Sequence, residues 1–161
     1  MSKAVMLSIR PKWVEKIANG EKTIEVRKTR PKLATPFKAY IYCTKPKYPH
    51  EDFISTDYPK PQFYGGGKVI GEFTCDQFWI GTPHNTNLLF CMAACMDGFD
   101  TEKYAKGKTL YGWHISDLRI YDTPKELSEF TGLRDTKFGA APYEIKRPPQ
   151  SWCYVEAMKD G

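Results

Sequence analysis

The sequence predicts an α+β fold, a small mixed β-barrel with short flanking helices, from three observations. Segments with strand character, among them 4–9, 38–43 and 68–75, are separated by short segments with helical periodicity. The two kinds of segment do not keep the strict strand–helix–strand rhythm of a parallel sheet. With 161 residues, of which 41% are hydrophobic, the chain is long enough to bury one core. We therefore expect a single domain over 1–161.

The first elements follow one another closely. Residues 4–9 form a strand that leads to Pro11, a residue suited to the first turn of a helix, and Gly20 ends that helix. Residues 20–27 then alternate charged and apolar side chains, which is typical of a strand with one polar face. Residues 38–43 suit the next strand.

The middle of the chain is less regular. Residues 44–66 are rich in Pro, Tyr, Asp and Lys and show no period, so we expect a long surface loop or insertion near 44–66. The elements expected after it are a strand at 68–75, a helix from Leu88, a short helix capped by Asp100, a strand at 109–121, a short helix from Thr123 to about Gly132, and a final strand at the C-terminal end.

Charge is distributed unevenly along the chain. Residues 1–50 hold twelve Lys and Arg against three Glu and no Asp, a balance of 12 − 3 = +9. The remaining residues hold twelve basic and sixteen acidic groups, a balance of −4. A basic surface of this kind attracts polyanions by neutralising phosphates, although a lysine-rich surface without a partner gives the same count.

Other features bear on cellular location and metal binding. The sequence has no apolar run long enough to cross a bilayer and no cleavable leader, and its five cysteines are an odd number, so we expect a cytoplasmic protein with free thiols and no membrane partner. Cys91 and Cys95, with His84 upstream, lack the second ligand pair of a zinc site. We expect no metal and no cofactor.

The segment from Gly20 to Arg27 carries the main candidate binding residues. On a strand, Thr23, Glu25 and Arg27 share one face and the two aliphatic residues between them share the other, with Lys22 at the strand's start. A polar cluster on a rigid strand suits a small binding site. A half-exposed strand with a salt-bridged outer face is the alternative.

Glu72 interrupts an apolar run in a second strand. A carboxylate in such a run is costly unless it is paired, so we expect a basic partner such as Lys22 or Arg27. Lys22, Glu25 and Glu72 then form a group for acid, base or nucleophilic chemistry. Pairing keeps these groups charged, whereas burial of the lysine beside fewer carboxylates lowers its pKa toward that of a general base, and the sequence leaves both possibilities open.

Several motifs together resemble an ASCH domain of the PUA-like superfamily. They are Leu7-Ser8-Ile9, Pro11, the Gly20 to Arg27 segment, Gly71-Glu72-Phe73, and Pro148-Pro149-Gln150-Ser151-Trp152-Cys153-Tyr154. The resemblance spans nearly the whole chain, except the 44–66 segment. It implies a β-barrel with flanking helices, a cleft at the barrel mouth, and RNA or nucleotide-like ligands.

Some small proteins of that family are amidohydrolases of acetylated cytidine, with a lysine, a threonine nucleophile three residues later and a glutamate on a later strand. By this resemblance Lys22 matches the lysine and Glu72 the glutamate. Where those enzymes have the threonine, this chain has Glu25. A carboxylate does not reproduce the attack of a hydroxyl on an amide. Thr23, on the same strand face, is the nearest substitute.

The leading hypothesis is an ASCH domain that binds RNA or a nucleotide-like small molecule in a basic cleft. Lys22 and Arg27 would contact phosphate or a base edge, and Glu25 would accept hydrogen bonds from an exocyclic amine or hold the cations in place. The other expected ligand-binding residues are Thr23, Glu72, Lys12 and Arg30, and the candidate stacking aromatics are Trp13, Trp152 and Tyr154.

Two other hypotheses remain at the level of the sequence. The first is a hydrolase acting on a modified nucleoside or on RNA through Lys22, Glu25 and Glu72. The second is a protein-interaction module whose basic face meets an acidic partner, a protein partner that the sequence does not identify.

Overall fold

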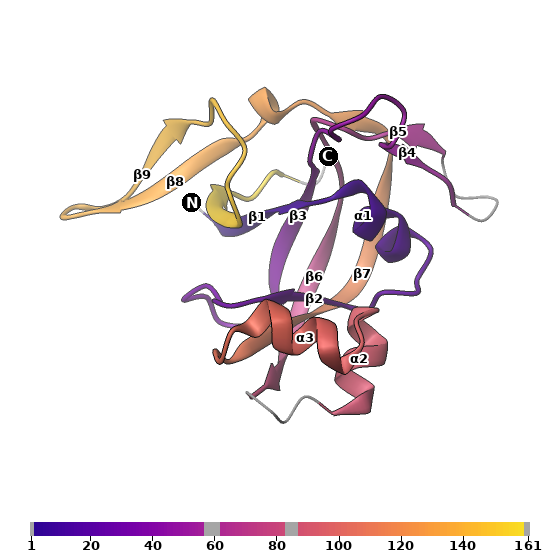
Figure 1. Ribbon diagram of the computed structural model, residues 1–161. Coiled ribbons are helices and arrows are strands. Elements are labelled where there is room, and N and C mark those ends of the chain that lie inside the picture. Colours follow the sequence, from indigo (N-terminus) through magenta and orange to yellow (C-terminus); the bar gives the residue numbers. More distant parts are fainter. Residues whose placement is uncertain (1, 57–61, 83–86, 160–161) are drawn as a thin grey trace.

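The computed structural model describes residues 2–56, 62–82 and 87–159 (Figure 1). In these ranges it contains an eight-stranded sheet in the order β2-β7-β6-β3-β1-β10-β8-β9 and a separate pair, β4-β5. The strands are β1 (Lys3–Ile9), β2 (Ile24–Arg27), β3 (Phe37–Cys43), β4 (Phe53–Ile54), β5 (Phe63–Tyr64), β6 (Lys68–Gly81), β7 (Leu110–Lys125), β8 (Thr131–Thr136), β9 (Gly139–Glu144) and β10 (Trp152–Glu156). The helices are α1 (Pro11–Ala18), α2 (Leu88–Ala94), α3 (Gly98–Ala105) and a 3₁₀ turn, η1 (Leu127–Glu129).

The sheet is largely antiparallel, with one parallel pair. β1 and β3 run parallel, with Val5 opposite Ala39, so the chain between them must cross back, and α1 forms part of that crossover. β10, from the end of the chain, pairs antiparallel with the other edge of β1. The first and last strands of the sequence are therefore neighbours in the middle of the sheet. This arrangement is mixed α+β, as the sequence predicts.

The expectation of a barrel is wrong in one respect: among the described strands the sheet does not close. Its edges are β2 and β9, which do not pair with each other, and a gap separates β2 from the already paired strands β1 and β10. Side chains span that gap, because Arg27 Nη2 donates to Ser8 O at 2.8 Å and Trp152 Nε1 donates to Thr29 Oγ1 at 2.9 Å.

Alternation along each strand divides the core between the two faces of the sheet. In β1, Val5 and Leu7 belong to one buried cluster, which also contains Trp113, whereas Ala4 and Met6 belong to another. A third cluster joins β2 to α2 and α3, which lie against that strand (Figure 1). The parity of a residue in its strand thus decides which face its side chain reaches.

Several predicted boundaries differ from those observed. The helix expected from Thr123 is wrong, because β7 continues to Lys125, which pairs with Val69 of β6. Only the short η1 follows, and residues near Gly132 belong to the β8-β9 hairpin, which projects from the body of the molecule (Figure 1). The N-cap of α3 is Asp97, with Asp100 completing its capping box.

The remaining differences concern the start of β2 and the 44–66 segment. β2 begins at Ile24, after a turn in which Gly20 has a φ of 79°. The 44–66 segment contains the short β4-β5 pair, with residues 57–61 outside the described part. None of the helices described is long and apolar enough to cross a membrane.

Candidate functional site

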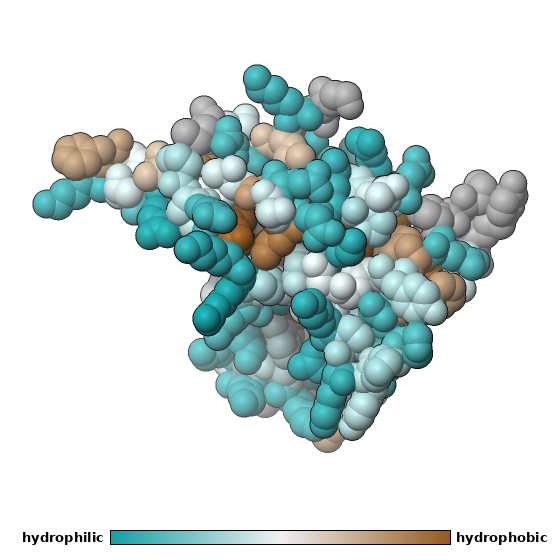
Figure 2. Space-filling view, turned by 90° about the horizontal axis from the view of Figure 1, so that it is seen from above, coloured by the Kyte–Doolittle hydropathy of each residue, from teal (hydrophilic) through white to brown (hydrophobic). Residues whose placement is uncertain are grey.

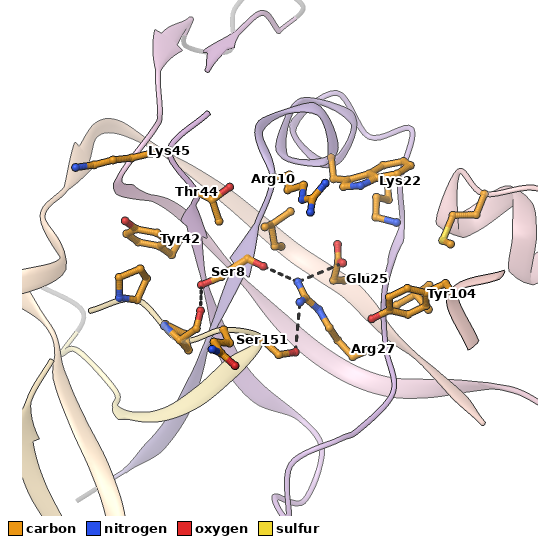
Figure 3. A pocket seen from close by; sticks show the side chains of 17 residues that line it. Ser8, Arg10, Lys22, Glu25, Arg27, Tyr42, Thr44, Lys45, Tyr104 and Ser151 are labelled. Atoms are coloured by element: carbon orange, nitrogen blue, oxygen red, sulfur yellow. Dashed lines mark hydrogen bonds and ion pairs between the residues drawn. The ribbon is translucent and has the colours of Figure 1, made fainter. Parts of the chain in front are cut away.

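A cavity of about 940 Å³ opens beside β2, where this strand faces the end of β1 (Figure 3). Its walls come from five parts of the chain that are far apart in sequence. The lining residues are Ser8, Ile9, Arg10, Trp13, Lys22, Glu25, Val26, Arg27, Tyr42, Thr44, Lys45, Met96, Tyr104, Pro148, Pro149, Gln150 and Ser151. The cavity therefore combines three of the predicted charged residues with side chains from β1, β3, α3 and the segment before β10.

The alternation of β2 places Glu25 and Arg27 in this cavity. Ile24 and Val26 belong to the buried cluster formed with Phe90 of α2, so the strand is anchored by its apolar face. Glu25 and Arg27, at the odd positions, face the opposite side and project toward the cavity (Figure 3). The polar strand face predicted from the sequence is present, and it faces the cavity.

Arg27 is held from three directions. Its Nη2 donates to Ser8 O at 2.8 Å, its Nη1 lies 3.4 Å from Ser151 Oγ, and Nη2 is 3.4 Å from Glu25 Oε1. Ser8 is itself fixed, since its hydroxyl donates to Pro149 O at 2.6 Å. The planar guanidinium thus links β2, β1 and the segment before β10 in one orientation.

Glu25 is a buried carboxylate with unused hydrogen-bonding capacity. Its side chain is 8% exposed, and only Oε1 approaches the cation of Arg27. Oε2 has no hydrogen-bond partner among the described residues, and neither does Arg27 Nε beside it. A buried polar atom without a partner costs about 1–3 kcal/mol, more for a charged group, and native proteins rarely leave one so. The pair is therefore suited to a ligand that both donates and accepts hydrogen bonds.

Lys22 is the second buried cation of the cavity. It is 3% exposed, its Nζ donates to Ala94 O at 2.6 Å, and Nζ lies 4.8 Å from the centre of the Trp13 ring. Burial lowers the pKa of Lys22 from 10.5, and the nearby Glu25 carboxylate opposes that shift. The sequence leaves open whether pairing keeps Lys22 charged or burial lowers its pKa. In the structure the effect of burial is larger than the opposing effect of Glu25.

Glu72 does not line the cavity. Its carboxylate pairs with Lys38 Nζ at 2.9 Å and accepts a hydrogen bond from Tyr121 at 2.9 Å. Glu72 thus has the basic partner that the sequence predicts, but the partner is Lys38, and the two residues named as examples, Lys22 and Arg27, are wrong. Adjacent residues of a strand face opposite sides of the sheet. Because Phe73 packs in the cluster that contains Trp113, Glu72 points to the opposite face.

The other predicted residues lie around the cavity rather than in its lining. Thr23 is exposed, and its backbone bridges Ala93 O and Ile115 N. Lys12 lines a neighbouring cavity and lies with its Nζ 4.5 Å from the Trp13 ring centre. Arg30 stacks its guanidinium against Phe78.

The three candidate stacking aromatics separate in the same way. Trp13 lines the cavity, whereas Trp152 and Tyr154 pack, partly buried, against the cluster of Val5 and Leu7.

Sequence reasoning missed several lining residues. Ser8 and Ser151 stand in motifs that the sequence analysis quotes, and Ser8 is a polar residue in an apolar strand, a signal that points to a role. Arg10, Lys45 and Tyr104 come from a helix start, a loop and a helix far along the chain. No local pattern connects them, because only the fold brings them together.

The candidate metal ligands give no site among the residues described. Cys91 is buried, Cys95 is the C-cap residue of α2, and His84 lies outside the described residues. No group of three or more His, Cys, Asp or Glu placed to hold a metal ion occurs in 2–56, 62–82 and 87–159.

The ASCH domain profile matches residues 7–149, and the chain belongs to the ASCH domain family. The resemblance seen in the sequence is thereby confirmed. Among solved structures, the crystal structure of ASCH from Zymomonas mobilis superimposes with a TM-score of 0.65 at 18% identity, covering 95% of this chain and 87% of that one.

Two variants of that Zymomonas mobilis protein also match at 18% identity. Its tyrosine-to-phenylalanine variant gives a TM-score of 0.59, covering 96% of this chain and 91% of that one. Its serine-to-alanine variant gives 0.58, with 95% and 88% covered. At this identity the likeness concerns the fold. No curated protein matches the sequence.

Proposed function

We propose that this ASCH domain binds RNA or a nucleotide through the cavity over β2, with a nucleobase seated against Glu25. The observation that carries the proposal is the Glu25 carboxylate, buried beside Arg27 with Oε2 unpartnered among the described residues. Cytosine, adenine and guanine each present an exocyclic amine that donates to such an oxygen, next to a ring acceptor that suits Arg27 Nε. Uracil has no exocyclic amine.

The surrounding side chains support the same ligand class. Trp13 offers an aromatic surface in the wall, and Arg10 and Lys45 at the cavity are exposed cations that suit a phosphate. Lys22, whose Nζ already donates to Ala94 O, adds positive potential to the cavity. One acidic group among four cations gives a site that favours an anionic ligand with a hydrogen-bond donor at its base.

The hydrolase alternative receives no comparable support. It needs Lys22, Glu25 and Glu72 around one ligand, and the carboxylate of Glu72 is engaged by Lys38 and Tyr121 outside the cavity lining. We therefore propose binding rather than hydrolysis as the function.

The test is calorimetric titration with the four ribonucleoside 5′-monophosphates. We expect the uridine nucleotide to bind most weakly. We expect Glu25→Gln to weaken binding of the preferred nucleotide by about tenfold or more, because a hydrogen bond to a charged acceptor is worth about 1.5–3 kcal/mol. Lys137→Ala, an exposed cation at the tip of the β8-β9 hairpin, is the control and should bind as wild type. Equal affinity of Glu25→Gln and wild type for every nucleotide would refute the proposal.

A further inference from the structure

A second cavity of about 730 Å³ adjoins the first one. The two share Arg10, Thr44 and Lys45, so they form one continuous depression. The second cavity is lined by Arg10, Pro11, Lys12, Thr44, Lys45, Pro46, Lys47 and Glu51. Four cations and one carboxylate leave it strongly positive. We call these two cavities together the basic groove.

The 44–66 segment builds the outer wall of this groove. Its start is fixed to the core, because Thr44 N donates to Ile9 O at 2.9 Å. Lys45 lies across Gly67, where an added Cβ would come within 2.8 Å of the lysine Cε. Asp52 accepts from Gly66 N at 3.1 Å and ties the segment back to the beginning of β6. Two of the lysines of the groove, Lys45 and Lys47, are thus carried on an anchored segment.

The same segment presents aromatic rings to solvent next to those lysines. Tyr48 and Tyr64 are each 55% exposed and Phe53 is 40% exposed. Tyr64 packs against Phe53 with ring centres 5.1 Å apart, and Lys47 Nζ lies 5.3 Å from the ring centre of Tyr48. Hydrophilic residues dominate the face seen from above in Figure 2, interrupted by apolar patches. Exposed aromatic rings beside a basic channel are typical of surfaces that bind single-stranded nucleic acid.

We propose that the described residues of this segment, 44–56 and 62–66, extend the site into a groove for single-stranded RNA. This proposal rests on the proposed function: one nucleotide occupies the cavity over Glu25, and the phosphates that follow it lie along Arg10, Lys12, Lys45 and Lys47. The next bases stack on Tyr48 and Tyr64. A single strand is required, because a base paired in a duplex cannot turn its amine toward buried Glu25 or its ring face toward a tyrosine.

The experiment compares the preferred ribonucleoside monophosphate with a six-nucleotide RNA of the same base, at about 50 mM salt. We expect the hexamer to bind at least about tenfold more tightly. Its affinity should also fall more steeply with salt, since each neutralised phosphate adds roughly 0.7 to the logarithmic slope for a single strand. A hexamer that binds no more tightly than the monophosphate, or a duplex of the same length that binds equally well, overturns the groove.

Two sets of variants locate the contacts. Lys12→Ala with Lys47→Ala removes two exposed cations that line only the second cavity, and we expect it to weaken hexamer binding about tenfold and monophosphate binding much less. Lys103→Ala with Lys137→Ala makes the same charge change at exposed positions outside both cavities and should change neither. Equal losses in the two double variants would mean that only net charge matters, which contradicts the groove.

The aromatic contact has its own matched pair. We expect Tyr64→Ala to weaken hexamer binding at least about fivefold, the lower end of the effect of losing one stacked base. Phe138→Ala removes a ring that is 98% exposed at the tip of the β8-β9 hairpin and should have no effect. An unchanged Tyr64→Ala overturns the stacking surface.

The two proposals fail separately. If the monophosphate binds in a Glu25-dependent way but the hexamer gains nothing, the groove is wrong and the nucleotide site stands. If no monophosphate binds but the hexamer still depends on Lys12 and Lys47, the base-binding cavity is wrong and the basic groove alone is supported.

Discussion

Lys22 and Glu25 are charged residues that the fold keeps away from solvent, at 3% and 6% exposure. Each is held by few partners: Lys22 by Ala94 O and the Trp13 ring, and Glu25 by Arg27 at 3.4 Å. Burial of charge with so little compensation lowers stability, and sites that bind ligands commonly retain such groups.

The buried amine of Lys22 makes stability depend on pH in a defined direction. Its pKa is lowered from 10.5 by burial, so between the folded pKa and 10.5 the unfolded chain holds the proton more tightly than the folded one. Stability contributed by this group therefore rises with pH through that window. We predict that the free energy of unfolding of wild type, relative to Lys22→Met, increases as the pH rises toward 10.5.

Urea unfolding of both proteins at each pH measures this difference. Cys43 and Cys75, whose pKa values burial raises to about 12, shift stability the other way at alkaline pH. They are present in both proteins, so their effect cancels in the comparison. A difference that stays constant or falls with pH would contradict the assigned direction.

At the scale of elements, the long pair β6 and β7 supports the edge strand that carries the site. β7 pairs with β2 on one side and β6 on the other, and Trp113 of β7 lies opposite Glu25. The β6-β7 pairing shifts register near Gly71, where the two backbones approach closely. A Cβ at Gly71 would lie 2.5 Å from Arg119 O, so this position accepts only glycine without rearrangement.

We predict that Gly71→Ala lowers the free energy of unfolding by about 1–3 kcal/mol, the usual range for overpacking a filled site. The control is Gly98→Ala at the first residue of α3, where nothing lies within 4 Å of an added Cβ, and it should leave stability within about 0.5 kcal/mol of wild type. Chemical denaturation of the three proteins provides the measurement. Equal stability of Gly71→Ala and wild type would mean that the strands separate there at no cost.

At the scale of the whole molecule, the curled sheet is held across its open side by side chains. Arg27 reaches Ser8 O and Ser151, and the segment after β2 reaches β10, where Lys32 N donates to Tyr154 at 2.9 Å. These contacts place the strand that bears Glu25 opposite β1 and leave room between them for the cavity.

We predict that Arg27→Met destabilises the protein by about 3 kcal/mol, because it removes the cation beside a buried carboxylate as well as the link to β1. Adding Glu25→Gln to that variant should recover part of the loss, since the charge left without its partner is then gone. Arg30→Met is the comparison and should cost much less, because the Arg30 guanidinium lies over the Phe78 ring and forms no ion pair with a residue of the described ranges. If Arg27→Met unfolds at the same urea concentration as wild type, the open side is not held by Arg27.

The sequence by itself determined the local part of this protein. Alternation predicted that Glu25 and Arg27 share a face, Pro11 and Gly20 marked the limits of the first helix, and the motifs identified the ASCH family, because each of these depends on neighbours within a few residues. Only the tertiary structure decided that Glu72 faces the opposite side, that the sheet stays open, and that Ser8, Tyr104 and Ser151 meet around Arg27. Those facts depend on strand order, register and bulges, which arise from packing between segments distant in the sequence and leave no periodic trace in any one of them.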